Sequence, residues 1–219
     1  MDTEGLKNYV RPFIDLIKES GAPYFWIASG AIRDYFVTGG MTPKDIDIFF
    51  ANAESRDKAI HYLIGQGFKT IRLLPRHQGA KFDLTNGAVP EKHSHLAQGN
   101  KYSYHSMDIG CWDGKDEDLG EYARTPSGCI SWFDFTIEMA ALDSNNKFIC
   151  HPDFEHHITN KILVRNPIQH AHPRGNNRRL LKYIKNGFTI DQENLLQWLE
   201  DQEATFAYRF DRNKKKLKL

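Results

Sequence analysis

A short alternating segment, Asp45-Ile-Asp47-Ile-Phe-Phe, constrains this chain more than any other feature of its sequence. Side chains alternate across a β-strand, so the two aspartates share one face while the isoleucines and the last phenylalanine face the core. Two like charges that close together are costly unless a cation lies between them, and oxygen ligands favour a divalent cation. The segment therefore predicts a half-buried strand that carries a metal site.

A turn of small residues precedes this strand and opens a helix that begins Ser29-Gly30-Ala-Ile-Arg33-Asp34. The N-terminus of a helix presents unpaired N–H groups and the positive end of the helix dipole, which together suit a phosphate. Ser29 is a residue type that commonly caps a helix with its side chain. Combined with the Asp-x-Asp strand, the turn predicts a site for metal-assisted phosphoryl or nucleotidyl transfer.

The composition is that of an ordinary soluble globular protein. The 219 residues are 40% hydrophobic and 26% charged, and a formal net charge of +1 argues neither for nor against a nucleic-acid partner. Cys111, Cys129 and Cys150 have no paired spacing, which favours a reducing compartment. No apolar run approaches the roughly 20 residues that span a bilayer, and the first residues are unlike a secretory leader. We expect a cytoplasmic protein with no membrane partner.

The order of helices and strands predicts an α/β (α+β) fold with one mixed sheet and flanking helices. Helices are expected at 4–19, 30–39, 53–66 and 133–142, and strands at 24–28, 45–50, 69–74, 81–85, 102–112, 147–150 and 161–165. Segments 86–100 and 113–128 are expected to be loops, and two helices are expected at 176–186 and 191–206. Pro167 and Pro173 mark a boundary between a domain at 1–168 and a helical extension with a basic tail at 169–219.

Three segments, in order, resemble the head domain of the poly(A) polymerase and tRNA CCA-adding family, which belongs to the DNA polymerase β-like nucleotidyltransferases. That family has a Gly-Gly-x-Val-Arg-Asp turn before a Lys-Asp-x-Asp strand, and here Ser29-Gly-Ala-Ile-Arg-Asp34 precedes Lys44-Asp-Ile-Asp47. Phe133-Asp134-Phe-Thr-Ile-Glu138 is similar to the family segment Arg-Arg-Asp-Phe-Thr-Ile-Asn. Residues 154–165 resemble the short helix and strand that close the family head. The resemblance covers about residues 24–165 and implies a mixed-sheet nucleotidyltransferase head domain.

By that resemblance Asp45 and Asp47 ligate two Mg²⁺ ions, and a neighbouring strand supplies a third carboxylate. Asp108 is favoured, because Met107, Ile109 and Cys111 are expected to face the core on either side of it, and its spacing before Asp134 fits the family. Asp83 has the same alternation and remains the rival.

Five residues are implied as nucleotide contacts by the same resemblance: Ser29, Gly30, Arg33, Lys44 and Asp134. Arg33 and Lys44 would screen the triphosphate, and Asp134 matches the residue that contacts the ribose. These last three residues have ordinary alternatives, since the two cations can simply pair with neighbouring aspartates and Asp134 can be a plain helix cap.

The implied activity is that of a metal-dependent nucleotidyltransferase, which moves an NMP from an NTP, with ATP as one candidate, to an acceptor hydroxyl and releases pyrophosphate. An RNA 3′ end, tRNA-like or other, is the favoured acceptor. Two alternatives stay open: transfer to a protein or small-molecule acceptor, and a non-catalytic relic of the fold that binds a nucleotide or RNA.

The chain also departs from the family in several places. Trp132-Phe133 stand where the family has Arg-Arg, Glu138 stands where it has Asn, and Arg179 alone survives from the Glu-Asp-x-x-Arg element that selects bases. These departures argue against a true CCA-adding enzyme.

Two further features fit no firm assignment. The clusters His93/His95, His151/His156/His157 and His170/His172, taken with Cys150, match no established zinc spacing. The basic tail at 209–218, with Phe206, Tyr208 and Phe210 nearby, has the composition to follow a phosphate backbone, but a solubilising terminus explains it equally well.

Overall fold

A seven-stranded mixed sheet forms the centre of the computed structural model, which describes residues 1–39, 44–74, 79–97, 104–111, 124–166, 177–200 and 203. The strand order is β3-β4-β5-β2-β1-β6-β7. The strands are β1 Phe25–Ala28, β2 Lys44–Phe50, β3 Thr70–Leu74, β4 Gly79–Asp83, β5 Tyr104–Cys111, β6 Ala140–Asp143 and β7 Phe148–Cys150. Strands β2 and β5 run parallel, and the other neighbours in the sheet pair antiparallel. The predicted mixed sheet is confirmed.

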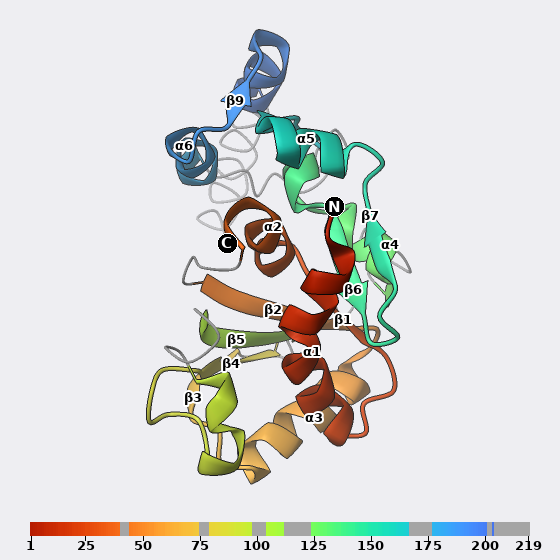
Figure 1. The fold of residues 1–219 in the computed structure, drawn as a ribbon, viewed down its shortest axis with the longest axis vertical. Helices are drawn as coiled ribbons and strands as arrows, with labels where there is room; N and C mark the ends of the chain where they lie inside the picture. The colour runs from red at the N-terminus through yellow and green to blue at the C-terminus, as the bar shows by residue number, and fades with distance from the viewer. Residues whose placement is uncertain are drawn as a thin grey trace, which may run out of the picture.

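Helices flank this sheet. They are α1 Thr3–Glu19, α2 Gly30–Thr38, α3 Ala53–Gly65, α4 Pro126–Ile130, α5 Phe154–Asn160 and α6 Asn177–Lys185, with 3₁₀ helices at Glu91–Leu96 and Thr136–Glu138. Figure 1 shows α5, α6 and the short strand β9 (Thr189–Ile190) gathered at one end of the molecule, beyond α2, with α3 and β3 at the other end. No helix in the described part of the chain is long and apolar enough to cross a membrane.

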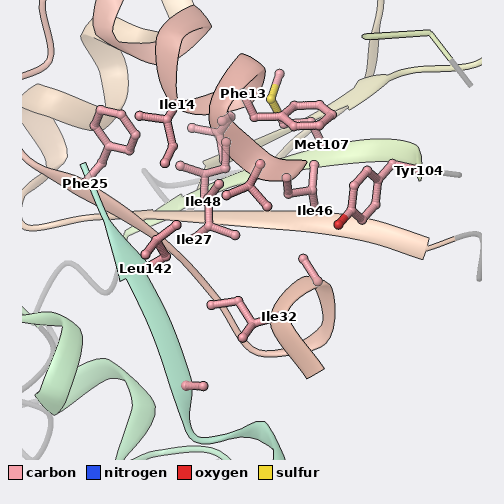
Figure 2. Close-up of a cluster of buried hydrophobic side chains, with 14 of the residues drawn as sticks. Phe13, Ile14, Phe25, Ile27, Ile32, Ile46, Ile48, Tyr104, Met107 and Leu142 are labelled. Carbon is pink, nitrogen blue, oxygen red and sulfur yellow. The ribbon is translucent and has the colours of Figure 1, made fainter. Parts of the chain in front are cut away.

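The larger of two buried apolar clusters lies on one face of β2 and β5, and a smaller one around Trp26 lies against β1 and β6. Ile46, Ile48 and Phe50 of β2 are fully buried, in one cluster with Phe13 and Ile14 of α1 (Figure 2). Met107 and Ile109 of β5 belong to the same cluster. The alternation predicted for β2 is therefore confirmed, and it leaves Asp45 and Asp47 on the opposite face.

The helix predicted at 133–142 is wrong. A 3₁₀ turn occupies Thr136–Glu138, and residues 140–143 form β6, which pairs with both β1 and β7. All four residues of β6 are buried and the first three are apolar, so the segment lacks the alternation that distinguishes a strand from a buried helix. Pairing in the sheet, rather than local pattern, decides its structure.

Other boundaries differ by less. Strand β4 begins at Gly79, two residues before the predicted start at 81, and the predicted loop at 86–100 contains the 3₁₀ helix Glu91–Leu96. In the segment predicted as a loop at 113–128, only 124–128 are described, and α4 begins there at Pro126. The strand predicted at 161–165 is reduced to β8 Ile162–Leu163, which pairs parallel with β9.

The two C-terminal helices are confirmed as far as the structure describes them, as α6 and as a helix at 192–200. Their apolar side chains join the core under the sheet: Trp198 is 2% exposed and stacks on Phe135 with ring centroids 4.7 Å apart, and Tyr183 meets Phe135 edge-on at 5.6 Å. Residues 167–176 and 204–219, which include the predicted boundary prolines and the basic tail, lie outside the described residues. The predicted boundary between a domain at 1–168 and a helical extension at 169–219 stays a prediction.

The Trp198–Phe135 stack gives a test of how the C-terminal helices are held. Replacing Trp198 with Ala removes a buried aromatic side chain, so we expect the free energy of unfolding to fall by about 3–5 kcal/mol in urea titration. Leu199 is 49% exposed on the same helix, and Leu199→Ala is the matched control, with an expected change within about 0.5 kcal/mol. Equal effects of the two substitutions would contradict the packing described here.

Candidate functional site

Three acidic side chains lie near one another on the face of β2 and β5 opposite the larger apolar cluster. In the parallel pairing of β2 with β5, Asp47 lies directly beside Asp108, and Asp45 lies beside Ser106. Ser106 Oγ donates a hydrogen bond to Asp45 Oδ1. Asp83 is placed differently, because its Oδ1 accepts hydrogen bonds from the Thr85 backbone N–H at 2.8 Å and from Thr85 Oγ1 at 2.7 Å. Asp108, rather than Asp83, therefore lies where the predicted third carboxylate is expected, and its role as a ligand stays a prediction.

A lysine that the sequence did not single out lies within this group. Lys81 of β4 is the cross-strand partner of Asp108, and its Nζ lies 2.8 Å from Asp108 Oδ2 and 2.6 Å from Asp45 Oδ2. Within the described residues, no three histidine, cysteine, aspartate or glutamate side chains are already grouped to hold a metal ion. In this structure the cation between two of the carboxylates is an ammonium group.

The three carboxylates have unequal proton affinities. Burial, followed by repulsion from the nearby Asp108 and Asp45 carboxylates, raises the pKa of Asp47 to about 7, against the opposing effect of Lys81 and Arg33. Burial also raises the pKa of Asp108, which the Lys81 ammonium partly offsets. At Asp45 burial acts in the same direction, but hydrogen bonds from Lys81 and Ser106 outweigh it and hold the pKa below its ordinary value. The site is therefore short of positive charge around Asp47.

A cleft of about 560 Å³ opens beside these carboxylates. Ser29 and Gly30 at the N-terminus of α2 line it together with Asp45 and Asp47. The remaining lining residues are Arg33, Glu138, Arg178, Arg179, Lys182 and Tyr183, of which the last four come from α6. The predicted phosphate-binding turn and the Asp-x-Asp strand thus share one cleft, and α6 adds a basic wall.

Ser29 lies at the N-cap position of α2, but its side chain makes no capping hydrogen bond, so the predicted cap is wrong. Its backbone has φ +62° and ψ −118°, a conformation that strongly favours glycine. The family that the sequence resembles has glycine at this position. The fold therefore keeps the glycine-type turn around a serine, at a cost in backbone strain.

Arg33 is 4% exposed and belongs to a buried polar network. Its Nε donates to Asp34 Oδ1 at 2.9 Å, and its Nη1 lies 3.1 Å from Glu138 Oε1 and 2.5 Å from the Tyr183 hydroxyl. The Tyr183 hydroxyl also donates to Glu138. Pairing of Arg33 with Asp34, the simpler alternative, is confirmed, while contact with a triphosphate stays a prediction.

Asp134 is buried and accepts a hydrogen bond from Arg179, whose Nη1 also lies 3.8 Å from Glu138 Oε2. The alternative of a plain helix cap is wrong, because Phe135 holds the N-cap position of the following 3₁₀ turn. Phe133, which stands where the related family has arginine, packs against Phe49 with ring centroids 6.3 Å apart. The side chain of Lys44 and residues 167–176 lie outside what the structure describes.

The histidines fall in other places. His157 bonds Thr136 Oγ1 through Nδ1 at 2.7 Å, and His93 is buried beside Phe68. His170 and His172 lie outside the described residues. Around Cys150 the described part of the chain offers no zinc-binding group.

In a comparison with protein families, the model described as Gabija anti-defense 2 family protein matches residues 4–161. No curated protein matches the chain by sequence.

Solved structures share the fold at low sequence identity. The Thermotoga maritima CCA-adding enzyme complexed with tRNA superimposes with a TM-score of 0.57 at 15% identity, over 95% of this chain and 44% of that one. The Bacillus stearothermophilus CCA-adding enzyme in complex with CTP gives 0.56 at 14%, over 85% and 42%. The chain spans less than half the length of these enzymes. The similarity confirms the nucleotidyltransferase head-domain fold that the sequence resemblance implied.

The strained turn at Ser29 generates a prediction on stability. Ser29→Gly relieves the positive φ without removing a capping bond, so we expect the free energy of unfolding to rise by about 1 kcal/mol. Ser29→Ala keeps the Cβ and is the control, with no expected gain. Urea titration of the three proteins measures the difference. A loss of stability in the glycine variant would mean that the serine side chain offsets the strain.

The raised pKa of Asp47 generates a prediction on pH dependence. Unfolded aspartate releases its proton near pH 4, whereas folded Asp47 holds it to about pH 7, so this residue lowers the free energy of unfolding as pH rises from 4 to 7. In metal-free buffer, Asp47→Asn is expected to match the wild type at pH 4 and to exceed it by roughly 1–4 kcal/mol at pH 8. Asp15→Asn, on the exposed face of α1, is the control. A wild-type-to-D47N difference independent of pH would contradict the assignment.

Proposed function

Because the chain belongs to the Gabija anti-defense 2 family and has the fold of CCA-adding nucleotidyltransferases, we propose that its anti-defence role is a metal-dependent nucleotidyl transfer. The enzyme moves an NMP from an NTP to an acceptor hydroxyl and releases pyrophosphate. One observation carries the proposal: Asp45, Asp47 and Asp108 meet on adjacent strands beside a cleft that also contains the N-terminus of α2.

The carboxylates fit magnesium by their chemistry. Mg²⁺ prefers oxygen ligands, and the two Oδ2 atoms of Asp45 and Asp108 already hold a cation, the Lys81 ammonium. We assign Asp45, Asp47 and Asp108 as the residues that hold the metal. When bound, magnesium lowers the pKa of an attacking hydroxyl and stabilises negative charge on the α-phosphate.

The remaining walls of the cleft suit a triphosphate. The first backbone N–H groups of α2, from Gly30 onward, are oriented to bind an anion placed at the start of the helix. Arg178, Arg179 and Lys182 line the opposite wall from α6 and supply positive charge there. In this proposal the phosphates lie between the two helices with the α-phosphate toward the carboxylates. Lys44, at the start of β2, remains a candidate phosphate contact, and Asp134 a candidate ribose contact.

For the acceptor we propose an RNA 3′ end. The support is the kind of enzyme that shares the fold, since one neighbour is complexed with tRNA and another with CTP. The family is described as acting against the Gabija defence. We therefore expect the acceptor RNA to be one that this defence needs in order to act.

The proposal is tested by incubating the protein with Mg²⁺ and each α-labelled NTP, with and without RNA. Wild type is expected to place label on RNA, and Asp45→Asn, Asp47→Asn and Asp108→Asn are each expected to lower the rate by about 100-fold or more. Asp83→Asn is the matched control, because Asp83 is engaged by Thr85 in a turn, and it is expected to keep wild-type activity.

The distribution of label decides among the alternatives. Label on protein instead of RNA would replace the acceptor and keep the reaction. Full activity in the Asp45 and Asp47 variants, or no transfer from any NTP by a correctly folded wild type, would overturn the proposal.

A further inference from the structure

Lys81 approaches the acidic residues from a strand that holds it firmly. Its neighbours Ala80 and Phe82 are buried on the core side of β4, at 1% and 0% exposure, so the Lys81 side chain leaves from the acidic face. Register then places it opposite Asp108. Its Nζ contacts the Oδ2 atoms of Asp45 and Asp108 at 2.6 and 2.8 Å. A lysine at this position reaches the carboxylates without any change in the backbone.

We propose that Lys81 is a tethered cation that competes with the divalent metal for Asp45 and Asp108, so that metal binds tightly only together with a nucleotide. The inference rests on the proposed function, because it concerns the same carboxylates. A metal ion on those oxygens and an ammonium within about 4 Å of it repel each other, which makes the two mutually exclusive. Metal binding therefore requires the lysine to leave.

The displaced ammonium needs another anion. Lysine carries a compact charge on a flexible four-carbon stem, so Nζ can move several ångströms while the strand stays in place. Asp45, which Lys81 contacts, lines the cleft assigned to the triphosphate. Phosphate oxygens there would receive the ammonium, and each ligand would then favour the other. Lys81 thereby acts as a positioning residue that couples metal binding to nucleotide binding.

If Lys81 had a purely structural role, its substitution would change the affinity for the metal in the opposite direction. The Lys81 side chain is 29% exposed, and ion pairs at such positions contribute little to stability. If its task were to hold the carboxylates together, removing its charge would let them separate and would weaken metal binding. If it competes with the metal, removing its charge strengthens metal binding. The sign of the change distinguishes the two roles.

The test measures Mn²⁺ binding to the full chain by the loss of the free-ion EPR signal, without nucleotide. Lys81→Met keeps the stem and removes the charge, and it is expected to lower the Kd for Mn²⁺ by about 10-fold or more. Because a free nucleotide also binds Mn²⁺, binding in the presence of a non-hydrolysable NTP analogue is measured by equilibrium dialysis with the analogue on both sides, and the wild-type and Lys81→Met values are then expected to converge. Lys81→Arg is expected to bind Mn²⁺ like the wild type. Lys69→Met is the control with no expected change, because Lys69 is an exposed lysine between α3 and β3.

The outcomes separate this inference from the proposed function. Unchanged or weaker Mn²⁺ binding in Lys81→Met, in a wild type that transfers NMP, would overturn the competition and leave the transferase intact. Tighter binding that persists in the double variant Asp45→Asn, Lys81→Met would place the metal elsewhere and would also overturn it. No Mn²⁺ binding by any of these folded proteins, with or without nucleotide, would remove the metal site itself and the proposed function with it.

Discussion

The parallel pairing of β2 with β5 is the constraint on which both the core and the site depend. It places Asp47 beside Asp108 on one face, while Ile46, Ile48 and Met107 pack under α1 on the other. Because side chains alternate along each strand, a slip of one residue would expose the apolar set and bury the carboxylates. The burial of the apolar face therefore fixes the register that brings the acidic groups together.

Compensating charge reaches the acidic site from separate elements. Lys81 of β4 contacts two of the carboxylates directly. Arg33 of α2 lies nearby, held by its contacts with Glu138 and Tyr183. Glu138 differs from the asparagine of the related family, and its extra negative charge is matched by Arg33 and by Arg179 of α6. The substitution is thus part of a junction between the head and the C-terminal helices, and it is not evidence for a decayed site.

The sequence predicted what depends on local pattern. The alternation in β2 gave the face of Asp45 and Asp47, and most helices and strands lie within a few residues of their predicted bounds. It left Asp83 and Asp108 unresolved and missed Lys81, because the choice among them depends on the register of β4 against β5, which no local signal encodes. The segment 140–143 was predicted as helix because a strand buried on both faces has no period. Ser29 was predicted as a cap from its residue type, whereas its positive φ is set by the turn.

The source of positive charge in the cleft is one point at which this chain departs from the family that its sequence resembles. Where the related family has an Arg-Arg pair in the head, Phe133 instead packs on Phe49, and three of the four basic side chains that line the cleft come from α6, the fourth being Arg33 of α2. That helix is held to the head by Tyr183, and the following helix by the stack of Trp198 on Phe135. A cleft built this way depends on the C-terminal helices for its charge as well as its shape. The affinity for a triphosphate would then depend on how α6 packs against the rest of the protein. The carboxylates would keep their positions in either case, because the register of the sheet sets them.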